Sequence, residues 1–414
     1  MTETSSRKNT AMARSPRTGG SSPRILGVDL ARALALIGMI AVHILPLRIV
    51  LTNGTFEPSV AATIFSGRSS ALFVLLAGVG LALLTGGPSG PAPSKLRSLR
   101  LSVLVRAWLI ALMGFGLGML DTNVAVILVH YGLLFFAAIP FLNMRRRTLG
   151  WWAAGWLLLS PMLYYVARPW VEGVLDPYRL GASPVLGDLA TPLAFIADLL
   201  LTGFYPLLIW FGFIFTGLFV GRMALAHPPV AFGLFITGSV LAVGSKLASV
   251  WLLDQPGAMK ALRGASELNA NGLEVALVTG QRLEGAINTP WFLAISAPHS
   301  GAPLDILHVT GCALAVLGAA QLLCLALTAV LGNLGEMLLW PLTGAGAATL
   351  TIYAGHLVAL DVFSDVSAGL PREVLFIIYV VATLLFGLLL KFINRRGPLE
   401  ALVHSVARTL SGSK

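Results

Sequence analysis

Charged residues are scarce in this chain of 414 residues: only 11% are Asp, Glu, Lys or Arg, while 56% are hydrophobic. Average soluble domains carry about 25% charged residues. This composition therefore excludes an ordinary soluble enzyme, and its hydrophobicity excludes a disordered chain. Glycine and proline are frequent (44 and 23) but follow no period, which excludes collagen. The mean hydropathy of +0.84 predicts a polytopic membrane protein built from helices.

Cysteine is also nearly absent. Cys312 and Cys324 lie in one apolar stretch, about 18 Å apart along a helix, which is too far for a disulfide. The chain has no metal-ligand spacing and no phosphate-cradling motif, so we expect no metal site and no nucleotide loop. Gly78-Val79-Gly80 lies inside an apolar run and lacks the strand-to-helix context of a dinucleotide fold.

Long hydrophobic runs dominate what is present. At roughly 20 residues per span, they account for about ten membrane spans. We place these spans at 25–47, 66–86, 99–120, 124–142, 149–167, 196–221, 229–252, 304–330, 339–361 and 374–393. The sequence thus predicts an all-α polytopic transmembrane bundle at 24–401, between a disordered basic tail at 1–23 and a C-terminal tail at 402–414.

The formal net charge of +10 has a membrane explanation. With ten spans both termini lie on one side, together with the basic loops around Lys95, Arg146 and Arg222. The positive-inside rule makes this side cytoplasmic, so we expect a plasma-membrane protein with cytoplasmic termini and no nucleic-acid partner. The opposite loops carry fewer basic residues and hold Glu57, Glu172, Asp176, Asp188, Asp254, Glu267, Glu274, Glu284 and Asp365.

Ionisable residues inside spans are costly and mark candidate functional sites. In the first span Asp29 and Arg32 are spaced i, i+3 and can pair. Arg32 and His43 are eleven residues apart, so they project from one helix face about 16 Å apart. Arg32 would lie near the cytoplasm and His43 near the far side, an arrangement suited to transfer of a group across the bilayer. Anchoring at the membrane interface is the alternative explanation.

Other polar residues lie at a similar depth to His43. Arg68 opens the second span, His130 lies in the fourth, and Tyr353 and His356 lie i, i+3 in the ninth. Hydrogen bonds between helices are the alternative role for these histidines. Small residues recur at helix-packing spacing, which predicts close helix contacts and permits a homodimer: Gly114 with Gly118, and Gly217 with Gly221.

Six segments, in order along the chain, resemble the membrane acyltransferase superfamily. That group includes the heparan-alpha-glucosaminide N-acetyltransferase-like, DUF418/DUF1624-type and acyltransferase-3 proteins. The segments are Arg24-Ile25-Leu26-Gly27-Val28-Asp29-Leu30-Ala31-Arg32-Ala33-Leu34-Ala35, Gly67-Arg68-Ser69-Ser70-Ala71-Leu72-Phe73, Tyr205-Pro206-Leu207-Leu208-Ile209-Trp210, Gly217 to Arg222, Leu350-Thr351-Ile352-Tyr353 and Arg395-Arg396-Gly397-Pro398-Leu399-Glu400.

The resemblance implies a membrane-bound O- or N-acyltransferase. The donor would be cytoplasmic acyl-CoA, with acetyl the first expectation. The acceptor would be a hydroxyl or amine of an extracytoplasmic glycan, glycolipid or small sugar. Arg32, ten residues and then His43 is similar to the Arg-X10-His pattern of acyltransferase-3 proteins, which implies a catalytic His43. The heparan-type enzymes instead place their active histidine after the first helix, and no histidine lies between Leu45 and Ser66 here.

Further roles are assigned by depth. Arg32, with Asp29, would hold the CoA end, because a cation favours its negative charge. Arg68 or Tyr353 would stabilise the oxyanion, and His356 or His130 would relay protons. Two other functions remain open at this point: a transporter or flippase for a lipid-linked or small polar molecule, and a non-catalytic membrane partner or sensor.

Overall fold

The structure is a computed structural model that describes residues 25–175 and 183–412. The predicted basic tail at 1–23 lies outside the described residues. The chain is almost entirely helical, and one short antiparallel hairpin pairs β1 (Arg48–Val50) with β2 (Phe56–Pro58). This confirms the all-α class that the hydrophobic runs predict.

The first half of the chain forms nine helices within the described ranges. They are α1 (Leu26–Ile44), α2 (Val60–Phe65), α3 (Arg68–Leu84), α4 (Leu96–Leu117), α5 (Leu128–Ala138), α6 (Arg146–Val174), α7 (Pro192–Ala197), α8 (Leu207–Gly221) and α9 (Pro228–Leu253). Short 3-10 turns occupy Gly87–Ser89, Pro93–Lys95, Ile139–Phe141 and Leu186–Ala190, and a π-helical turn occupies Asp198–Thr202.

The second half begins with two short helices at one end of the molecule and continues into the bundle. Its helices are α10 (Ala258–Ser266), α11 (Ala270–Thr279), α12 (Pro303–Leu331), α13 (Asn333–Leu338), α14 (Trp340–Ala347), α15 (Thr349–Val362), α16 (Ser364–Ser367), α17 (Arg372–Phe392) and α18 (Pro398–Ser411). Two 3-10 turns, Glu284–Asn288 and Pro290–Ala294, precede α12.

Six helices of the described chain are long and apolar enough to cross a membrane, and two bent pairs raise the number to eight. The pairs are Pro192–Thr202 with Leu207–Gly221, bent by 53°, and Trp340–Ala347 with Thr349–Val362, bent by 84°. The two other predicted spans coincide with α5, a shorter apolar helix, and with α6. A multi-pass membrane fold is therefore confirmed, whereas the number ten and the side of the termini stay predictions.

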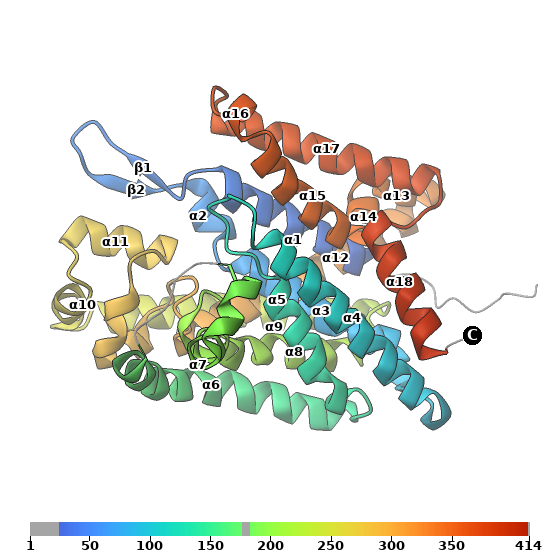
Figure 1. The fold of residues 1–414 in the computed structure, drawn as a ribbon, viewed down its shortest axis with the longest axis horizontal. Helices are drawn as coiled ribbons and strands as arrows, with labels where there is room; N and C mark the ends of the chain where they lie inside the picture. Colours follow the sequence, from blue (N-terminus) through green and yellow to red (C-terminus); the bar gives the residue numbers. More distant parts are fainter. Residues whose placement is uncertain (1–24, 176–182, 413–414) are drawn as a thin grey trace, which may run out of the picture.

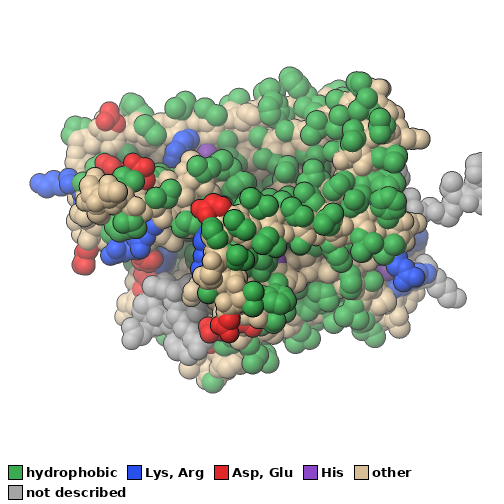
Figure 2. Space-filling model, turned by 90° about the horizontal axis from the view of Figure 1, so that it is seen from above, with side chains coloured by type: hydrophobic (Ala, Val, Ile, Leu, Met, Phe, Trp, Pro, Cys, Tyr) green, Lys and Arg blue, Asp and Glu red, His purple; other side chains and the backbone are tan. Residues whose placement is uncertain are grey.

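The long helices lie between two differently built ends (Figure 1). The hairpin, α10 and α11 form one end, and α18 with the C-terminus lies at the other. On the face drawn in Figure 2, hydrophobic side chains are densest from the middle to the right of the view, while most charged side chains gather in the left half and a few basic ones at the right edge. This distribution suits a bundle embedded in a bilayer, because a hydrocarbon layer accepts apolar side chains and rejects charge.

Glycines let the core helices approach closely, as their spacing predicts. A Cβ on Gly217 of α8 would collide with the Leu75 carbonyl and with Gly78 of α3, and a Cβ on Gly114 of α4 would meet the backbone at Val129 of α5. Gly78 is thus a packing glycine rather than part of a nucleotide loop. Such close contacts hold membrane helices together, since hydrocarbon offers no hydrophobic drive for association.

Arg222, which follows α8, connects the ends of α8, α3 and α5 through hydrogen bonds. It is 4% exposed, and its guanidinium donates to the carbonyls of Ala82, Thr85, Gly87 and Leu142 and to the Thr85 hydroxyl. These groups end α3 and follow α5, where helix carbonyls lack partners within their own helix. Arg222 is therefore a structural residue as well as one of the predicted cytoplasmic charges.

Candidate functional site

Helix α1 lies in the core of the bundle and carries three of the predicted site residues. Asp29 is 6% exposed, and Arg32 Nη1 donates to its Oδ1 over 3.2 Å. The predicted i, i+3 pair is thereby confirmed. The Arg32 guanidinium also packs over Gly80 of α3, where a Cβ would lie 2.6 Å from Nη2. Arg32 consequently has a fixed direction, away from lipid and towards a cavity between helices.

His43, at the other end of α1, contacts His356 of α15. His43 Nδ1 lies 2.9 Å from His356 Nε2, and the two rings are 5.2 Å apart between centroids. His356 Nδ1 lies 3.3 Å from the Ile352 carbonyl, to which it must donate. His356 Nε2 is then an acceptor for the His43 Nδ1–H, which leaves a lone pair on His43 Nε2. This tautomer is the one that a general base requires.

Tyr353 completes this group from the same helix. Its ring lies 5.2 Å from that of His356 and 6.5 Å from that of His43. The phenol oxygen accepts the Ile127 amide hydrogen over 3.3 Å, so its own O–H remains available as a donor. Phe73 of α3 stacks on Tyr353 at 6.2 Å and lies tilted against Tyr131 at 5.1 Å, and we call these three neighbouring rings the aromatic layer.

Glu400 of α18 positions the helix that carries Tyr353 and His356. Its carboxylate accepts the backbone N–H groups of Leu350 (2.6 Å) and Thr351 (3.2 Å) and the Thr351 hydroxyl (2.6 Å). These groups open α15 just after the 84° bend. A carboxylate is favourable at a helix N-terminus because it satisfies free N–H groups and the helix dipole. Two of the family-like segments, 350–353 and 395–400, are therefore in direct contact.

A cavity of about 400 Å³ lies on the other side of the aromatic layer, towards α18, and we call it the inner cavity. Its polar lining consists of Arg32, Arg106, Arg396, Glu400, His404, Tyr131 and Thr349. Arg106 Nη2 lies 3.3 Å from His404 Nδ1, while Arg106 Nε is buried without a partner among the described residues. Burial, followed by the nearby arginines, lowers the pKa of His404. The cavity is thus strongly basic, with three arginines against one carboxylate in its lining.

Arg68 and His130 do not join the histidine pair. Arg68 Nε donates to His308 Nε2 over 3.1 Å, and His308 Nδ1 in turn donates to the Ala242 carbonyl over 2.9 Å. His130 is 3% exposed and lies edge-on to Tyr205 at 5.7 Å. Both of its ring nitrogens lack partners in the described part of the chain. Their roles in catalysis stay predictions.

The sequence alone did not identify three residues of this region as parts of the site. Glu400 and Arg396 stand in a family-like segment without a role of their own, and Arg106 is a single arginine in the middle of an apolar run that no motif marks. The signal that could have found Glu400 is the segment itself. A carboxylate two residues after a proline that starts a helix, close behind two arginines, needs a partner when it lies near the membrane.

Comparison with known families gives one relevant match. The family model described as heparan-alpha-glucosaminide N-acetyltransferase, catalytic, matches residues 24–256, more than half of the chain. The matched range contains Arg32, His43, Arg68 and His130, whereas Tyr353 and His356 lie beyond it. Comparison with curated proteins gives no match.

Proposed function

The chain belongs to the heparan-alpha-glucosaminide N-acetyltransferase catalytic family, and on that premise we propose that it transfers an acetyl group from cytoplasmic acetyl-CoA to an extracytoplasmic acceptor. The acceptor group is a hydroxyl or amine of a glycan, glycolipid or small sugar. The observation that carries this proposal is the contact between His43 and His356 above a basic inner cavity. The protein would act in the plasma membrane with both termini in the cytoplasm.

The inner cavity has the chemistry of a site for the donor. Acetyl-CoA carries several phosphate charges, and arginine binds phosphate oxygens with paired, directed N–H groups. Arg32, Arg106 and Arg396 line the cavity together and give it three cationic side chains. The cavity lies at the α18 end of the bundle, which the positive-inside rule assigns to the cytoplasm.

His43 and its neighbours would perform the transfer as follows. His43 Nε2 takes the proton of the acceptor hydroxyl or amine, and the acceptor atom attacks the thioester carbonyl. The new C–O or C–N bond forms, the C–S bond breaks, and the CoA thiolate receives the proton from His43. In the alternative route His43 Nε2 itself attacks the thioester carbonyl and the C–S bond breaks to release the CoA thiolate. The acceptor atom then attacks the acetyl-His43, the C–N bond to His43 breaks, and the acceptor proton passes to the thiolate. His356 keeps His43 in the required tautomer, and the free O–H of Tyr353 faces the developing oxyanion.

The deciding experiment compares wild-type protein with His43→Ala, purified in nanodiscs and supplied with labelled acetyl-CoA and a panel of sugar acceptors. We expect CoA release by the wild type and a loss of about 10²–10⁴-fold in His43→Ala. His227→Ala is the matched control, because His227 is exposed outside the helices that form the site.

Two outcomes would contradict the proposal at different levels. A wild type that neither binds acetyl-CoA nor releases CoA with any acceptor removes the enzymatic function. Full activity in His43→Ala removes the assignment of His43 while leaving acetyl transfer in place.

A further inference from the structure

A second cavity lies at the opposite end of the molecule, between α6, the α7–α8 break and the loops before α12. It has a volume of about 410 Å³, and we call it the outer pocket. Its charged lining residues are Arg48, Arg168, Arg282 and Glu284. Arg168 is paired with Glu172, so Arg48 and Arg282 against Glu284 give the pocket its surplus of positive charge.

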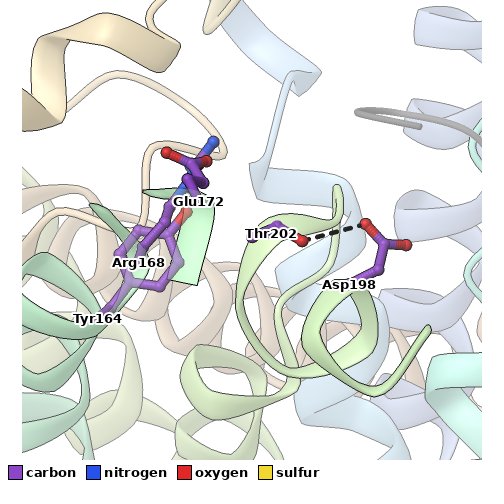
Figure 3. A network of polar contacts seen from close by, with 5 residues as sticks. All are labelled: Tyr164, Arg168, Glu172, Asp198 and Thr202. Carbon is purple, nitrogen blue, oxygen red and sulfur yellow. Dashed lines mark hydrogen bonds and ion pairs between the residues drawn. The ribbon is translucent and has the colours of Figure 1, made fainter. Parts of the chain in front are cut away.

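Arg168 is built into the wall of this pocket. It is 8% exposed, its Nε donates to Glu172 over 2.7 Å, and Nη1 donates to the Tyr164 hydroxyl. Figure 3 shows Arg168 held between these two residues of α6, with Thr202 and Asp198 on the neighbouring turn. Two of its nitrogens are thus committed, and the guanidinium is fixed in place at the pocket.

Arg48 and Arg282 carry the uncompensated charge. Both are exposed, and within the described ranges neither forms an ion pair with a carboxylate. The Arg48 guanidinium lies over the Phe56 ring at 4.8 Å, which orients it at the hairpin. Arg282 adopts a φ of 61°, a left-handed conformation that is costly for a residue other than glycine. Backbone strain of this kind often accompanies a functional constraint.

The position of these arginines is unexpected for the predicted outer side. Basic residues are depleted in extracytoplasmic loops, and the loops here are mainly acidic. Three of the few outer arginines nevertheless line a single pocket. Random placement in an acidic surrounding would favour ion pairs with the loop carboxylates, and Arg48 and Arg282 form none. A ligand that brings its own negative charge explains this arrangement.

The pocket also has aromatic walls, and a chain of contacts through Tyr205 links it to the histidine site. Tyr164, Phe204 and Phe292 line it, and such rings stack on the apolar faces of sugars. His299, another lining residue, lies 5.9 Å from Tyr205. Tyr205 donates to the Ala125 carbonyl, and Tyr353 accepts the amide of Ile127, two residues later. Tyr205 and residues 125–127 therefore lie between the outer pocket and Tyr353.

We propose that the outer pocket binds an acceptor sugar through an oxyanion, a carboxylate or phosphate, which Arg48, Arg168 and Arg282 recognise. The role of the bound sugar as acetyl acceptor rests on the proposed function, whereas binding of its oxyanion in the pocket does not. Arginine is suited to both anions because its planar guanidinium donates paired hydrogen bonds to two oxygens. Arg48 and Arg282 select the ligand, and the buried Arg168 forms the fixed wall.

The test measures binding by calorimetry to the full chain in neutral phosphatidylcholine nanodiscs without acetyl-CoA. The probes are glucuronate, glucose 6-phosphate and uncharged glucose. We expect at least one anionic sugar to bind and glucose to bind at least about tenfold more weakly, because a hydrogen bond to a charged group is lost. Arg48→Gln and Arg282→Gln should each weaken the anionic sugar by a similar factor. Arg263→Gln is the matched control, an exposed outer arginine on α10 outside the pocket.

Three results would overturn the proposal: equal binding of charged and uncharged sugars, no binding of any probe, or unchanged binding in both arginine variants. A lipid arm repeats the measurement with a soluble short-chain phosphatidylglycerol as probe. Arginine-dependent binding of that lipid with none of the anionic sugars would assign the pocket to a membrane headgroup and overturn its role as a sugar site.

The His43→Ala variant separates this inference from the proposed function. It should retain the arginine-dependent binding of the anionic sugar even though it releases no CoA. If the wild type binds the anionic sugar but releases no CoA, acetyl transfer is refuted and the binding proposal for the outer pocket holds. If the wild type transfers acetyl groups without such binding, only the binding proposal is refuted.

Discussion

Removal of the Glu400 carboxylate should uncouple α15 from the rest of the site. Glu400 accepts three hydrogen bonds from Leu350 and Thr351 at the N-terminus of α15. His356 lies five residues after Thr351, about 7.5 Å along the helix axis. Hydrogen bonds to a charged group are worth about 1.5–3 kcal/mol each when buried. Because Glu400 is half-exposed, the loss in Glu400→Ala should be closer to that of a helix cap, about 2 kcal/mol.

The effect on activity should exceed the effect on stability. A displacement of about 1 Å in a reacting group can cost up to about 10²-fold in rate, and the His43–His356 contact depends on the position of α15. We therefore expect kcat for acetyl transfer to fall by about 10–10²-fold in Glu400→Ala. The KM for acetyl-CoA should not rise, since the change removes a negative charge from the basic inner cavity.

The assay combines thermal unfolding in nanodiscs with CoA release at varied acetyl-CoA. Glu400→Gln keeps one carbonyl acceptor for the α15 amides and should restore part of kcat. Glu336→Ala is the control, because Glu336 is exposed on α13. Wild-type Tm and kcat in Glu400→Ala would refute this reasoning. A raised KM with an unchanged kcat would show that Glu400 acts on the donor rather than through α15.

Three further predictions concern other parts of the molecule. Arg222→Met should destabilise the protein by at least about 3 kcal/mol in thermal unfolding, because it leaves several buried carbonyls of the α3 and α5 ends without a donor. Burial lowers the pKa of His299 to about 4, so its contribution to stability is complete above about pH 6.5 and is lost as the pH falls towards 4. His299→Gln should flatten the unfolding profile in that window, and an unchanged profile would contradict the prediction. Arg32→Gln and Arg396→Gln should each raise the KM for acetyl-CoA about tenfold with little change in kcat, and an unchanged KM would place the donor elsewhere.

The predicted spans show how far hydrophobic patterning reaches. Each of the ten apolar runs coincides with a helix or a bent helix pair, because a bilayer leaves a backbone few alternatives to the helix. The pairing of Asp29 with Arg32 was also readable, since a spacing of three residues is local geometry. Composition could not reveal that the ninth span breaks at Ala348 by 84°. That bend depends on Gly344 packing against Gly387 of α17, and on Glu400 capping the second half.

Similar depth in the bilayer did not predict which of the polar residues are in contact. It grouped His43, Arg68, His130 and His356 at one level, yet only His43 and His356 are in contact. Depth fixes one coordinate, whereas a site requires all three. The two others are set by which helix faces meet, and this depends on glycine contacts between distant helices such as α3 and α8.

The two imidazoles of the candidate site are 313 residues apart in the chain, and the family match ends between them, at residue 256. His43 belongs to the matched part, and its partner belongs to helices that the match does not reach. The position of His356 depends on Glu400, which also borders the basic inner cavity. Any occupant of that cavity would therefore lie against the same carboxylate that holds α15. If the proposed phosphate-rich donor binds there, we expect it to influence the geometry of the histidine pair directly, without a separate allosteric element.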